Sequence, residues 1–130
     1  MPVAKIAQQQ GDKVTQIHTT VGMIGIGQLG LPIAVNLMRA GYEVVGFRRT
    51  DREAFVRSGG IVLDTPVQVA QRADVLLLCL PGESAQLEVL DGPNGILPAL
   101  NPGKIVIELG TFHREFKLKV ARRITEKGAR

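Results

Sequence analysis

Short apolar runs alternate along the chain with segments in which apolar residues recur every three or four positions. The runs predict five β-strands, at residues 21–26, 43–48, 61–63, 75–80 and 104–109. The segments after each run predict helices at residues 29–40, 50–59, 84–90 and 114–127, with one more beginning at Pro66. Regular alternation of strands and helices indicates βαβ units and therefore a parallel sheet. The run at residues 75–80 is apolar at each position, which is typical of a central strand covered on both faces.

Two helix starts carry capping signals. Thr65, Pro66 and Gln68 combine an N-cap hydroxyl, a proline at the first helical position and a capping glutamine. Thr50 and Glu53 match a capping box as well, which predicts a helix that begins at Thr50 and contains Asp51.

Three glycines, Gly25, Gly27 and Gly30, form a G-x-G-x-x-G motif between the first predicted strand and the first predicted helix. In this context the first glycine permits the tight turn, the second lets the backbone approach a pyrophosphate, and the third allows close packing of helix on strand. Free N–H groups at the helix start, around Gln28 and Leu29, would face the phosphates. The sequence therefore predicts a dinucleotide site here; a glycine-rich turn without a ligand is the alternative.

The second predicted strand ends without the acidic residue that commonly binds the ribose hydroxyls of NAD. Arg48, Arg49 and Thr50 stand there instead, and forked guanidinium donors suit a 2′-phosphate. This composition favours NADP over NAD as cofactor. The alternative is that both arginines are solvated surface charges.

Several segments, in the same order, resemble the β-hydroxyacid dehydrogenases, the family that includes 3-hydroxyisobutyrate dehydrogenase and the cofactor domain of 6-phosphogluconate dehydrogenase. They are VGMIGIGQLGLPIAVNLMRAGYEVV at 21–45, FRRT at 47–50, ADVLLLCLP at 73–81, GPNG at 92–95 and PGKIVIE at 102–108. The resemblance covers roughly residues 21 to 128. It implies a Rossmann-type, doubly wound α/β fold with strand order 3-2-1-4-5, helices on both faces, and hydride transfer between nicotinamide and a small hydroxyacid or its semialdehyde. It also implies that Leu80 and Pro81 border the ribose on the nicotinamide side, and that Thr111 approaches the nicotinamide.

The chain departs from the family pattern after the last predicted strand. The family reads Asp-x-Ser-Thr-x-x-Pro, and here Gly110 replaces the serine while the proline is absent. His113 is expected to flank the last helix, and no residue is nominated as catalytic. The substrate loop, the catalytic lysine and the helical dimerisation domain of the family follow beyond this region. We therefore expect residues 21–130 to form a dinucleotide-binding domain that is inactive alone; a non-catalytic nucleotide-binding or interaction module is the alternative.

Composition limits the other function classes. The 130 residues allow one domain, and no apolar run reaches the length of about 18 residues that spans a membrane. The single cysteine, Cys79, cannot form an internal disulfide and favours a reducing cytoplasm. The positive charges behind the net charge of +4 form no single block: Arg48, Arg49 and Arg52 cluster near a strand end, and others are spread along the last helix. Four Phe and one Tyr offer no stacking platform, so nucleic acid is not an expected partner.

Two expectations concern the ends of the domain. Residues 1–20 lack sustained periodicity and predict a flexible N-terminal extension. The strand at 104–109 is expected to be an edge of the sheet, carrying Ile105, Val106, Ile107 and Leu109, and thus a place for self-association.

Overall fold

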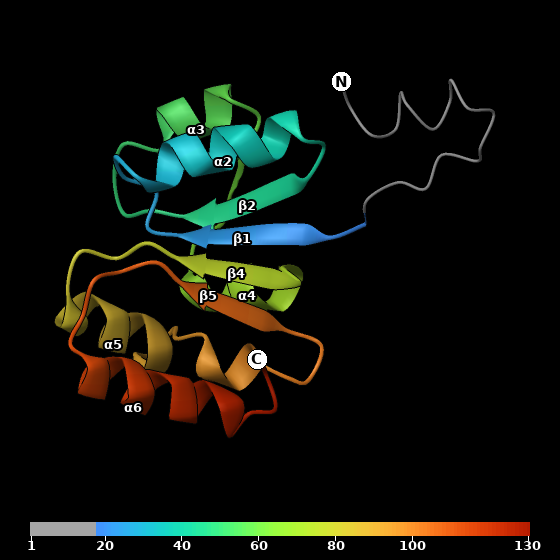
Figure 1. Cartoon of the computed structure of the whole chain (residues 1–130). Helices are drawn as coiled ribbons and strands as arrows, with labels where there is room; N and C mark the ends of the chain where they lie inside the picture. The colour runs from blue at the N-terminus through green and yellow to red at the C-terminus, as the bar shows by residue number, and fades with distance from the viewer. Residues whose placement is uncertain (1–17) are drawn as a thin grey trace.

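A five-stranded parallel sheet forms the centre of the protein, as the computed structural model describes it for residues 18–130. The strands are β1 (Thr20–Ile24), β2 (Glu43–Phe47), β3 (Ile61–Val62), β4 (Val75–Leu78) and β5 (Ile105–Glu108), in the order β3-β2-β1-β4-β5 (Figure 1). The predicted fold class and strand order are confirmed. The predicted flexible extension falls mostly on residues 1–17, outside the described residues, and Thr20 already belongs to β1.

Helices cover both faces of the sheet (Figure 1). On one face lie α2 (Gly30–Arg39) and α3 (Glu53–Arg57); on the other lie α4 (Pro66–Arg72), α5 (Glu83–Asp91), the short 3-10 helix η1 (Leu97–Ala99) and α6 (Arg114–Thr125). Two buried clusters correspond to the two faces. Ala34 and Phe55 pack with Met23 on the α2–α3 side, while Val69 and Leu90 pack with Leu78 on the other side. Among the described residues no helix is long and apolar enough to cross a membrane.

β1, the central strand, lies in close contact with α4. A Cβ atom on Gly22 would lie 2.6 Å from Val69 Cγ1 and 2.8 Å from Ala73 Cβ, so only glycine permits this approach. β1 pairs in parallel with β2 on one side and with β4 on the other, with Val21 opposite Val44 and Val75. The turn that follows β1 therefore lies between the carboxyl ends of two neighbouring strands.

The start of α3 differs from the prediction. The helix begins at Glu53, its cap residue Arg52 makes no side-chain cap, and the predicted capping box of Thr50 and Glu53 does not form. Asp51 has a φ of 53°, a left-handed conformation that interrupts a helix, so it lies in the loop before α3 and not inside the helix. The loop is held by Arg52, whose Nε donates to Arg48 O at 2.6 Å.

The predicted cap of α4 is confirmed. Thr65 Oγ1 accepts a hydrogen bond from Gln68 N at 3.3 Å, and Gln68 Oε1 accepts from Thr65 N at 3.2 Å and from Asp64 N at 2.9 Å. Pro66 occupies the first turn, where its missing N–H costs nothing. These bonds fix the loop between β3 and α4.

β5 is the edge strand, as expected, but part of its edge is already paired. Arg130 N donates to Lys104 O at 3.1 Å, and Val106 N donates to Arg130 O at 2.7 Å. This is the pattern of a parallel ladder. Val106 C=O and Glu108 N–H, which face outward next along β5, have no hydrogen-bond partner among residues 18–130. The unpaired part of the β5 edge is thus shorter than the sequence predicts.

Candidate functional site

The turn from β1 into α2 depends on two glycines whose missing side chains allow backbone contact. Gly25 has a φ of 91°, and a Cβ atom there would lie 2.3 Å from Cys79 O at the end of β4. A Cβ atom on Gly30 would lie 2.3 Å from Gly25 O. The first glycine therefore packs the turn onto β4, and the third brings the start of α2 down onto the turn, as the motif predicted.

Gly27, the middle glycine, faces open space. No heavy atom lies within 4 Å of the position its Cβ would take, and Gly27, Gln28 and Leu29 are all exposed. Their N–H groups have no acceptor among the described residues. Exposed N–H groups at the positive end of a helix form a site for an anion. The geometry suits a phosphate that lies above Gly27.

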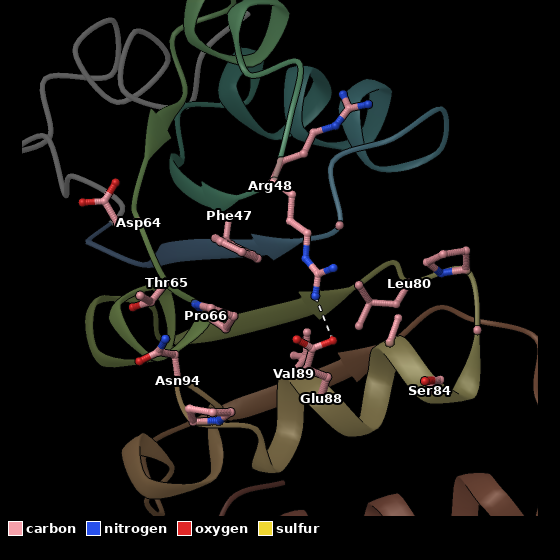
Figure 2. A pocket seen from close by; sticks show the side chains of 16 residues that line it. Phe47, Arg48, Asp64, Thr65, Pro66, Leu80, Ser84, Glu88, Val89 and Asn94 are labelled. Carbon is pink, nitrogen blue, oxygen red and sulfur yellow. Dashed lines mark ion pairs between the residues drawn. The ribbon is translucent and has the colours of Figure 1, made fainter.

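A crevice of about 780 Å³ extends from this turn across the carboxyl ends of the strands. Figure 2 shows its walls: Phe47 at the end of β2, Thr65 and Pro66 at the start of α4, and Ser84, Glu88 and Val89 from α5. Gly25, Leu80 and Pro81 also line it. Asn94, near the other end, is held because its carbonyl accepts a hydrogen bond from Val67 N at 3.0 Å. The crevice has the volume and the mixed lining expected of a site for a small organic ligand or cofactor.

The two arginines after β2 both line this crevice but have different partners. Arg48 is tied to its own loop: its guanidinium donates to Asp51 O at 3.3 Å and lies 3.8 Å from the Asp51 carboxylate. Arg49 reaches across to α5, where its Nη2 lies 2.8 Å from Glu88 Oε2. Thr50 is exposed and does not line the crevice. Sequence reasoning missed Glu88, because a helical residue far along the chain carries no signal of this contact.

A second pocket, of about 410 Å³, lies at the ends of β4 and β5 and shares Pro81 and Gly82 with the crevice. Thr111, Phe112 and His113 line it together with Glu83. Thr111 and Pro81 thus line the same pocket.

The loop that carries Thr111 explains the glycine at position 110. A Cβ atom on Gly110 would lie 2.4 Å from the Phe112 ring and 2.6 Å from Glu108 Oε1. The Glu108 carboxylate accepts a hydrogen bond from Gly110 N and pairs with Lys117 Nζ at 3.0 Å. Phe112 packs edge-on against Phe116 at 5.1 Å between ring centroids. The loop is thus closed by Phe112 and Glu108, in space that a serine side chain would need.

Cys79 lies close to both the glycine turn and this loop. Burial raises the pKa of its thiol, and the nearby Glu108 carboxylate raises it further. A thiol with a raised pKa stays protonated near neutral pH, so Cys79 lacks the thiolate character of a nucleophile. Among residues 18–130 no cluster of His, Cys, Asp and Glu could hold a metal ion.

The family model for the NAD binding domain of 6-phosphogluconate dehydrogenase matches residues 20–130. The chain belongs to this family. It is therefore an NAD(P)-binding domain of the oxidoreductase type. The glycine turn and the crevice lie at the carboxyl ends of the strands, the side on which open α/β sheets bind ligands.

Individual relatives agree with this assignment. Mitochondrial 3-hydroxyisobutyrate dehydrogenase of Mus musculus is 34% identical over 114 residues, which are 85% of this chain and 34% of that protein. The cytokine-like nuclear factor N-PAC of Danio rerio is 28% identical over 90% of this chain and 26% of its own length. The structure of an imine reductase from Streptomyces aurantiacus has a TM-score of 0.76 and 29% identity, covering 85% of this chain and 38% of that one. The chain thus spans between about a quarter and two fifths of the length of these three proteins.

The open space at Gly27 generates a direct test. We expect Gly27→Val to abolish NADPH binding while leaving the helix content measured by circular dichroism nearly unchanged, because the side chain would occupy the phosphate position without touching the fold. Asn36→Val, which puts the same side chain on an exposed position of α2, is the control and should bind normally. Unchanged NADPH affinity of Gly27→Val would exclude this turn as the phosphate site.

Proposed function

We propose that this chain is the NADP-binding domain of an oxidoreductase that transfers a hydride between nicotinamide and a small hydroxyacid or its semialdehyde. The observation that carries the choice of NADP is Arg49, a cation on the wall of the crevice at the carboxyl end of β2. In this fold the strand after the glycine motif ends beside the adenosine ribose. A guanidinium there supplies donors for a 2′-phosphate.

The residues of the crevice divide into three binding roles. Gly25, Gly27, Gln28, Leu29 and Gly30 form the turn that would receive the pyrophosphate. Arg48, Arg49 and Thr50 form the loop that would receive the 2′-phosphate. The Arg49 guanidinium reaches across the crevice to α5, and Thr50 is exposed beside it. Leu80, Pro81 and Thr111 would border the nicotinamide and its ribose, since they line the pockets at the ends of β4 and β5.

Asp51 is the acidic residue of the loop after β2 that could instead favour NAD. Its carboxylate lies 3.8 Å from Arg48, its side chain is 82% exposed, and it does not line the crevice. An acid that binds ribose hydroxyls needs to face the cofactor. We therefore retain NADP, and not NAD, as the proposed cofactor.

The nicotinamide, when bound, would supply the hydride chemistry, and this chain would hold the cofactor in position. The glycine turn would hold the phosphates, and the loop of Thr111 would set one wall beside the nicotinamide. No group in the described residues is assigned to proton transfer, so we propose that the chain alone binds the cofactor without turnover. Turnover of a small hydroxyacid with NADP by the purified chain would contradict this.

The single thiol, Cys79, is compatible with the cytoplasm as the proposed compartment.

A second candidate is a nucleotide-binding module without catalysis. It is favoured by the relative that is named a nuclear factor and not a dehydrogenase. Both candidates share the cofactor site. They differ in whether a longer protein that contains this domain together with a catalytic domain oxidises a hydroxyacid with NADP.

Cofactor selectivity tests the central part of this proposal. We expect the chain to bind NADPH more tightly than NADH, and Arg49→Ala to reduce that preference by about 1.5–3 kcal/mol, the range for a hydrogen bond to a charged group. Arg57→Ala, which removes an exposed arginine of α3 outside the crevice, should leave the preference intact. Equal affinities of the unmodified chain for the two cofactors would refute the proposal.

We also propose that the chain self-associates through β5. This strand has the unpaired Val106 C=O and Glu108 N–H groups on its edge. Ile107 on the strand and Leu109 directly after it are exposed over 42% and 37% of their surface. Unpaired strand edges with apolar side chains favour pairing with another chain.

Sedimentation over a range of concentrations tests the association. We expect a concentration-dependent oligomer that Ile107→Lys dissociates, because a charge on this strand opposes pairing. Leu118→Lys, at an exposed position of α6, is the matched control and should not change the distribution. A strictly monomeric chain at high concentration would count against the proposal.

A further inference from the structure

One ion pair joins the two long walls of the crevice. Arg49 projects from the loop after β2, and Glu88 projects from the second half of α5; their Nη2 and Oε2 atoms lie 2.8 Å apart. The dashed line that ends on Glu88 in Figure 2 marks this contact. The two residues come from different elements and have no other ion-pair partner among the described residues.

The pair lies midway along the crevice. Figure 2 shows Glu88 between Thr65, Pro66 and Asn94 toward one end and Leu80 and Ser84 toward the other. A dinucleotide with its phosphates at the glycine turn and its adenosine end extending toward Asn94 would pass this point. The contact between Arg49 and Glu88 would then cross the path of the adenosine half of the cofactor.

The strength of the pair allows a ligand to open it. The Arg49 and Glu88 side chains are 71% and 59% exposed, and exposed ion pairs are weak because water screens them. A phosphate group carries more charge than a carboxylate and can take two parallel hydrogen bonds from a guanidinium. A phosphate would thus displace Glu88 from Arg49, but the carboxylate would remain nearby and repel it.

We propose that Glu88 is a specificity-determining residue that competes with the 2′-phosphate of NADP for Arg49. This inference rests on the proposed NADP-binding function. The carboxylate occupies the anion position at Arg49 in the free chain, so NADP has to break the pair and then sits beside a like charge. NAD has no phosphate to place there and needs no contact with Arg49. Glu88 therefore lowers the affinity for NADP and reduces the preference of the site for NADP over NAD.

The test compares Glu88→Gln with the unmodified chain by calorimetric titration of NADPH and NADH at low ionic strength. We expect NADPH to bind about two- to fivefold more tightly to Glu88→Gln, the range set by the strength of exposed charge pairs, with NADH affinity nearly unchanged. Glu115→Gln removes the same charge from an exposed position of α6 outside the crevice and should change neither affinity.

Two further variants isolate the competition from other effects. On an Arg49→Ala background, Glu88→Gln should lose most of its effect on NADPH, because the guanidinium for which Glu88 and the 2′-phosphate compete is gone. Glu88→Asp retracts the carboxylate and should give a smaller gain than Glu88→Gln. Thermal unfolding of each variant controls for folding.

The outcomes separate this inference from the function on which it rests. If the unmodified chain binds NADPH and Glu88→Gln leaves that affinity unchanged or weakens it, competition by Glu88 is refuted while the NADP-binding function stands. An equal gain for NADPH and NADH also refutes it, because the effect would not depend on the 2′-phosphate. If the unmodified chain binds neither dinucleotide, both proposals are wrong.

Discussion

The backbone contact between Gly25 and the end of β4 is the constraint on which the site depends. Because a side chain at Gly25 would collide with Cys79 O and one at Gly30 with Gly25 O, the turn after β1 can close only with glycine at both positions. Closing the turn points the start of α2 over the carboxyl end of the sheet and leaves the N–H groups around Gly27 exposed. The anion site is therefore a consequence of close packing and needs no charged side chain.

The crevice follows from how the chain crosses the sheet. α2 and α3 cover one face, while α4, α5 and α6 cover the other, so the connections leave β1 and β4 toward opposite faces (Figure 1). Parallel sheets bind ligands at such a switch point, outside the carboxyl ends of the strands. The loop after β2 and helix α5 form opposing walls there, and the contact of Arg49 with Glu88 is what joins them in the free chain.

Most of the strands and helices are predictable because each depends on residues that are close together in the sequence. Apolar runs gave the five strands, and Thr65 with Gln68 gave the start of α4, since each signal lies within a few residues. The failures are contacts with no local signature. Because Asp51 has a left-handed backbone conformation, α3 begins at Glu53 and the expected cap at Thr50 does not form. Glu88 meets Arg49, and Arg130 pairs with β5, only because the fold brings distant segments together.

The most direct test is a map of backbone amide chemical shifts of the isotopically labelled chain as NADPH is added. If the glycine turn receives the pyrophosphate, the largest changes fall on the N–H groups of Gly27, Gln28 and Leu29, with a second group at Leu80 and in the loop after β2. Unchanged amide shifts in residues 27–29 at saturating NADPH would contradict the account, wherever else on the chain the cofactor bound.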